Sequence, residues 1–126
     1  MIIKRTIKQK WTNEDFGLTF TDNFLQNPEN NISWCELWCE TNRKHIFLGQ
    51  DLSPKKIEKA IKKFILTQIK TKVKRRAHDL DIKLKIRTLK NGLKVGADTF
   101  DLTKYNNDYA WLLTMIFEHC FHKYNH

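Results

Sequence analysis

Proline and glycine are scarce in this chain, which has two prolines and four glycines among 126 residues. Flexible linkers are typically rich in glycine, serine and proline, so we expect no linker to divide the chain. A chain of this length fits one domain with its own core, and we predict a single domain over residues 1–126. The hydrophobic fraction of 40% and the aromatic fraction of 12% exclude a disordered chain.

Long apolar runs and cysteine patterns are also missing. The N-terminal sequence MIIKRTIKQK is too polar for a signal peptide or a membrane span, so we expect no membrane association. The three cysteines, Cys35, Cys39 and Cys120, lack the spacing of a disulfide framework, and we expect reduced thiols in a cytoplasmic protein. No glycine-rich phosphate loop, Ser/His/Asp set or paired-carboxylate signature occurs, so we predict neither catalysis nor a cofactor.

The charge of the chain is strongly positive and unevenly distributed. Its formal net charge is +9, from 23 basic and 14 acidic residues. The segment from Lys55 to Arg76 holds ten Lys/Arg residues and one acid, Glu58, and thus carries a net charge equal to that of the whole chain. A lysine excess for solubility would be spread evenly, so this concentration indicates binding of a negatively charged partner.

Hydrophobic periodicity predicts strands before and after one long helix. Residues 16–22 alternate apolar and polar side chains, as do residues 32–40, and a hairpin with 45–50 follows. We predict an edge strand at 2–10 and a loop at 23–31, where asparagine and proline are frequent. Asn91-Gly92 predicts a second hairpin after an alternating strand at 82–87, and Asn106 or Asn107 is expected to cap the last helix.

Ser53 and Pro54 predict the start of a helix that continues to about Asp79, because serine caps helix N-termini and proline suits the first helical position. Its apolar stripe moves by about a third of a turn along the helix, at 100° per residue. The stripe consists first of Ile57, Ala60, Ile61, Phe64 and Ile65, and then of Leu66, Ile69, Val73, Ala77 and Leu80. Either the helix kinks near Thr67, or its halves pack against different neighbours.

These elements predict an α+β domain with a mostly antiparallel sheet of hairpins, one long basic helix and an apolar C-terminal helix. The basic helix and the basic face of the strand at 82–87 would form one anion-binding surface. We expect it to bind DNA, RNA or a nucleoprotein complex, since neutralising phosphates releases counterions. The predicted binding residues are Lys63, Lys70, Lys74, Arg75, Arg76, Lys83, Lys85 and Arg87.

The tryptophans at 34 and 38 suggest a second class of function. In a strand, Trp34, Glu36 and Trp38 share one face, although the four-residue spacing also fits a helix. We expect Trp34 and Trp38 to belong to the core. The alternative is an exposed interface, either for stacked bases or for a protein partner of an inhibitor or accessory protein of phage or bacterial type. The acids Glu36 and Glu40 argue against nearby phosphate.

Histidines provide two further hypotheses. His78 beside Arg75 and Arg76 has the elements of a small ribonuclease, with a base near neutral pH and cations for the phosphate. His119, His122 and His126 share one face of the last helix, a spacing that can hold zinc. We predict no metal there, because a polar chain end explains the same pattern.

Overall fold

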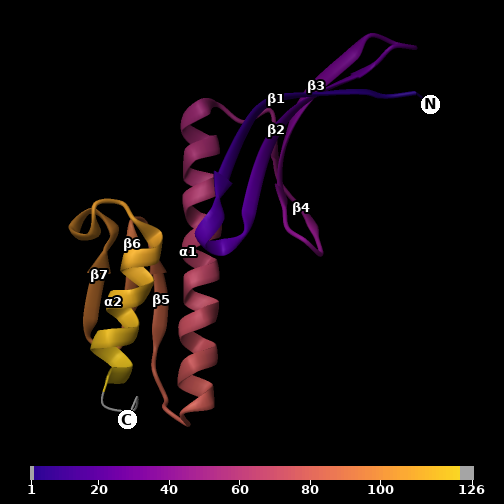
Figure 1. Ribbon diagram of the computed structural model, residues 1–126. Helices are drawn as coiled ribbons and strands as arrows, with labels where there is room; N and C mark the ends of the chain where they lie inside the picture. The colour runs from indigo at the N-terminus through magenta and orange to yellow at the C-terminus, as the bar shows by residue number, and fades with distance from the viewer. Residues whose placement is uncertain (1, 123–126) are drawn as a thin grey trace. The chain divides into compact units, whose positions relative to one another are not determined.

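The computed structural model describes residues 2–122, and its secondary structure is of the predicted α+β class (Figure 1). The strands are β1 (Lys4–Asn13), β2 (Leu18–Asn27), β3 (Ile32–Glu40), β4 (His45–Gln50), β5 (Ile86–Leu89), β6 (Gly92–Val95) and β7 (Asp98–Asp101). The helices are α1 (Pro54–Asp79), α2 (Tyr109–Phe121) and the short 3-10 helices η1 (Glu14–Phe16) and η2 (Leu102–Tyr105). No helix among residues 2–122 is long and apolar enough to cross a membrane.

The strands form two antiparallel sheets instead of the one sheet that we predicted. Their strand orders are β1-β2-β3-β4 and β5-β6-β7. The chain likewise divides into two compact units, Met1–Ile61 and Lys62–His126, with the boundary inside α1. Each sheet is a meander, because every strand pairs with its neighbour in the sequence. Each unit therefore builds its sheet from local hairpins.

The four-stranded sheet has one buried face, as the alternation in the sequence predicts. Phe20 pairs with Cys39 across β2 and β3, and both side chains are almost fully buried. Leu18 and Leu37 project from the same face and are buried as well. Because successive side chains of a strand point to opposite faces, Trp34 and Trp38 must lie on the other face.

Strand β2 continues through the first part of the predicted loop, so that part of the prediction is wrong. Asn23 lies inside the strand and is 0% exposed. Its Nδ2 donates to the carbonyl and hydroxyl oxygens of Thr21, at 3.1 and 3.0 Å, and to the Glu36 carbonyl oxygen at 3.2 Å. These acceptors satisfy a buried amide, and the connection to β3 begins only after Asn27.

Helix α1 has the predicted bounds. The Ser53 hydroxyl accepts a hydrogen bond from the Lys56 backbone N–H at 3.4 Å, and Pro54 is the first helical residue. After Asp79 the chain turns through Asp81, whose φ of 54° is left-handed. The helix is continuous and the unit boundary follows Ile61. The boundary thus lies within the first half of the stripe and does not separate the two predicted halves, so both explanations for the moving stripe stay predictions.

The core of the second unit contains the predicted second half of the stripe. Leu66, Ile69, Val73 and Ala77 are buried, and Leu80 is half-buried. Ile65, the last residue of the predicted first half, is buried as well. Helix α2 contributes Leu112, Ile116 and Phe121, and the sheet contributes Leu93, Val95 and Phe100. The N-cap of α2 is Asp108, whose carboxylate accepts from the Trp111 N–H at 3.1 Å, so the prediction of Asn106 or Asn107 is wrong.

The thiol of Cys39 provides a test of the buried face of the first sheet. Burial raises the pKa of Cys39 to about 11, and the charge of Glu40 adds to the shift. Because the thiolate is the reactive form, iodoacetamide should modify Cys39 far more slowly than the half-buried Cys35 at pH 8. The rate at Cys39 should rise as the pH approaches 11. Mass spectrometry of digested samples measures both rates.

Urea-unfolded protein is the control, since there the two thiols should react at similar rates. An unfolded thiol has a pKa of about 8.5, so raising the pH from there to 11 deprotonates the unfolded state first and lowers the free energy of unfolding. Equal labelling of Cys39 and Cys35 in the folded protein at pH 8 would contradict the buried face.

Candidate nucleic-acid interface

The positive charge of the chain belongs almost entirely to the second unit. Residues 62–126 contain 14 Lys/Arg residues and six acids, whereas residues 1–61 contain nine and eight. The second unit therefore carries a net charge of +8 and the first a net charge of +1. A negatively charged partner would therefore be attracted to the second unit.

The predicted cations of α1 surround its buried stripe. At 100° per residue, Lys63, Lys70 and Lys74 fall within about 40° of one another and form a row beside the stripe. Arg75 projects farther from the stripe and is exposed, whereas Arg76 lies at the edge of the stripe opposite the lysine row and is half-buried. Lys63 and Lys74 are exposed, and Lys70 is half-buried. The helix thus presents cations on the surface that its core leaves free.

The segment after α1 adds a second set of cations. The predicted strand at 82–87 is partly wrong, because β5 begins only at Ile86. The alternation nevertheless persists in the exposure of the side chains. Lys83, Lys85 and Arg87 are exposed, and Ile82, Leu84 and Ile86 are half-buried.

The end of α1 and this segment line an open hollow of about 560 Å³ on the surface of the second unit. Its lining residues are Lys74, Ala77, His78, Ile82, Lys83, Leu84, Lys85 and Ile86. The structure thus brings together three of the predicted binding residues, Lys74, Lys83 and Lys85. The other five, Lys63, Lys70, Arg75, Arg76 and Arg87, do not line the hollow.

The residues of the ribonuclease hypothesis all lie at the end of α1, but only one of them lines the hollow. The His78 side chain is 92% exposed, and its Nδ1 lies 4.0 Å from a carboxylate oxygen of Asp79. His78 lines the hollow, but Arg75 and Arg76 do not. A general base is normally oriented by a second group and faces the cations that hold the phosphate. Cleavage by His78 with Arg75 and Arg76 stays a hypothesis.

Trp34 and Trp38 are not core residues, so that prediction is wrong. Both are half-buried on the face opposite Leu37 and Cys39. The indole N–H of Trp34 donates to one carboxylate oxygen of Glu36 at 2.7 Å, and that of Trp38 donates to the other at 2.9 Å. The acid that separates the two tryptophans in the sequence thus satisfies both indoles.

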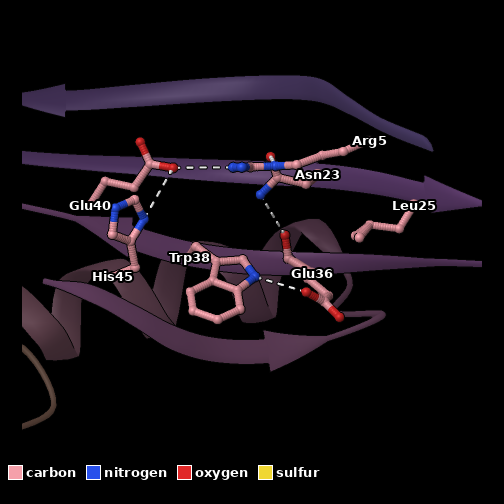
Figure 2. A pocket seen from close by; sticks show the side chains of 7 residues that line it. All are labelled: Arg5, Asn23, Leu25, Glu36, Trp38, Glu40 and His45. Carbon is pink, nitrogen blue, oxygen red and sulfur yellow. Dashed lines mark hydrogen bonds and ion pairs between the residues drawn. The ribbon is translucent and has the colours of Figure 1, made fainter. Parts of the chain in front are cut away.

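A pocket of about 270 Å³ lies on this face of the first sheet, and we call it the sheet-face pocket. Its lining residues are Arg5, Asn23, Leu25, Glu36, Trp38, Glu40 and His45. Figure 2 shows the Glu36 carboxylate at the indole nitrogen of Trp38, and the Glu40 carboxylate between Arg5 and His45. This pocket was not predicted from the sequence. The alternation of Trp34, Glu36, Trp38 and Glu40 is the signal that pointed to this face.

The C-terminal histidines have carboxylate partners. Nε2 of His119 lies 2.9 Å from a carboxylate oxygen of Asp98, and Nδ1 of His122 lies 3.3 Å from one of Glu118. His126 lies outside the described residues. Within residues 2–122, no group of three His, Cys, Asp or Glu side chains could hold a metal ion.

Comparisons with protein-family models, curated proteins and solved structures found no match to this chain. The assignment of function therefore depends on the geometry and charge of the two units themselves.

The exposed cations of the segment after α1 can be tested for a purely functional role. Replacing Lys83, Lys85 and Arg87 together by Gln should change the free energy of unfolding by less than about 0.5 kcal/mol per residue, because exposed side chains contribute little to stability. Replacing Leu93, which is 0% exposed on the neighbouring strand, by Ala should cost about 2–5 kcal/mol. Urea denaturation measures both. A triple variant as unstable as Leu93→Ala would show that these cations support the fold.

Proposed function

We propose that this protein binds nucleic acid, free or within a nucleoprotein complex, and does so without catalysis. The binding site is the basic surface, which comprises Lys63, Lys70, Lys74, Arg75, Arg76, Lys83, Lys85 and Arg87. The observation that carries the proposal is the hollow in the second unit, where Lys74 of α1 meets Lys83 and Lys85 of the following segment. Cations from two separate elements line this hollow. A helix whose lysines served only for solubility would not require cations from a second element beside it.

Phosphate backbones suit this surface for two reasons. A row of lysines along α1 matches a line of regularly spaced negative charges, and each neutralised phosphate releases counterions. The exposed Arg75 adds a planar guanidinium that can bind a phosphate with two hydrogen bonds, which lysine cannot do.

A membrane surface fits less well. Helices that lie on membranes insert an apolar face into the lipid, and the apolar stripe of α1 in the second unit is instead buried in the core. The three cysteines form no disulfide, which supports the cytoplasm as the place of action.

Charge reversal within the basic surface should abolish binding. The variant Lys74→Glu/Arg75→Glu changes two exposed side chains of α1, and each lost charged contact weakens binding by about tenfold or more. Fluorescence anisotropy with labelled single-stranded and duplex DNA and RNA measures the affinity at one fixed salt concentration. The fold should persist, because both side chains are exposed, and circular dichroism verifies this.

The matched control is Lys4→Glu/Lys10→Glu, which makes the same change in net charge at two exposed positions of β1. This variant should lose little affinity, since only the reduced overall charge acts on it. If both variants bind equally well, or if both lose the same affinity, the basic surface is not the binding site.

A further inference from the structure

The sheet-face pocket contains a carboxylate that has no cationic partner. Glu40 is balanced, because its Oε1 lies 3.1 Å from the Arg5 guanidinium and 3.9 Å from Nδ1 of His45. The Glu36 carboxylate accepts hydrogen bonds from the two indole N–H groups, and among residues 2–122 no Lys, Arg or His forms an ion pair with it. Indole donors orient a carboxylate but do not neutralise its charge. The pocket therefore offers a fixed negative charge to a ligand.

The Glu36 carboxylate also retains unused acceptor capacity. An ionised carboxylate has about four lone-pair sites, and the two indoles use one site on each oxygen. One further donor can therefore bind at each oxygen. Two parallel N–H donors at that spacing are the arrangement that a guanidinium provides.

The other walls of the pocket restrict the shape of a ligand. The ring of Trp38 and the side chain of Leu25 supply apolar surface beside Glu36 (Figure 2). A flat cation can lie against an indole, whose ring attracts positive charge. Asn23 is 0% exposed and bonds to the Glu36 carbonyl oxygen, and its Oδ1 accepts from Arg5 Nε at 3.0 Å. These bonds hold the polar lining of the pocket in place.

Exposed apolar side chains flank the pocket on the same face. Ile7 pairs with Asn23 across β1 and β2 and is 54% exposed, and Phe47 pairs with Trp38 across β3 and β4 and is 49% exposed. The Phe47 ring also packs edge-on against Trp38, with 5.4 Å between ring centroids. Tryptophan, tyrosine and arginine are the residues most enriched at protein-binding hot spots, where neighbouring contacts exclude water from the pocket.

We propose that the sheet-face pocket binds an arginine side chain of a partner protein. The guanidinium donates to both oxygens of Glu36 and lies against Trp38, while Ile7 and Phe47 contact the surrounding surface of the partner. The uncompensated Glu36 carboxylate disfavours phosphate here, so this site differs from the proposed nucleic-acid site of the second unit. Arginine suits it better than lysine, because the ammonium group cannot form two parallel hydrogen bonds to one carboxylate.

An NMR titration of the full chain tests the proposal with a defined probe, the capped peptide Gly-Arg-Gly. The indole N–H signals of Trp34 and Trp38 report directly on the Glu36 hydrogen bonds. Trp11, on the opposite face of the sheet, and Trp111, in α2, serve as internal references. We expect saturable shifts at Trp34 and Trp38 only. The peptide with citrulline, a neutral isostere of arginine, should bind about tenfold or more weakly.

The variant Glu36→Gln should bind the arginine peptide more weakly by a similar factor. The control variant Glu29→Gln, at an exposed position between β2 and β3, should bind it with unchanged affinity. Any of three results would overturn the proposal: equally tight binding of the citrulline peptide, the absence of a saturable shift, or an unchanged affinity of Glu36→Gln for the arginine peptide. Equally tight binding of the capped peptide Gly-Lys-Gly would overturn the assignment to a guanidinium. The citrulline comparison uses the unaltered protein, so it holds even if Glu36→Gln does not fold.

Discussion

Burial of the apolar stripe of α1 determines where the positive charge of this chain lies. Cations on one helix repel one another, so the segment from Lys55 to Arg76 would be a poor helix without compensation. The buried side chains from Ile65 to Ala77 provide it, because each removes apolar surface from water. Once the stripe faces the core, the lysines and arginines can occupy only the remaining surface of the helix.

The same constraint explains how the hollow of the second unit forms. Helix α1 ends at Asp79, and the left-handed Asp81 lets the Ile82 N–H return to the Ala77 carbonyl oxygen at 2.8 Å. The following residues alternate because their apolar side chains turn inward, which directs Lys83 and Lys85 outward beside Lys74. Packing of the core thus gathers cations that are separated along the sequence. The proposed nucleic-acid site follows from that packing.

Local patterns predicted much of this structure, and the exceptions have physical causes. The caps and the stripe of α1 are local signals, so its bounds were predictable. Strand β2 extends beyond its prediction because Asn23 finds acceptors on its own strand and on β3, which no local rule anticipates. The second sheet and the sheet-face pocket depend on pairing between strands: the pocket takes residues from β1, β2, β3 and β4, and only the alternation around Glu36 was visible beforehand. The two units consequently present different chemistry, with cations on one and a carboxylate beside an indole on the other.

The salt dependence of binding by the unaltered protein tests the electrostatic account most directly. The measurement is the association constant for a short nucleic acid over a series of salt concentrations. If about five phosphates are neutralised, the logarithm of the constant should fall against the logarithm of salt concentration with a slope of about −3.5 for single strands and about −4.5 for duplexes. A slope near zero, or no binding at low salt, would contradict the account.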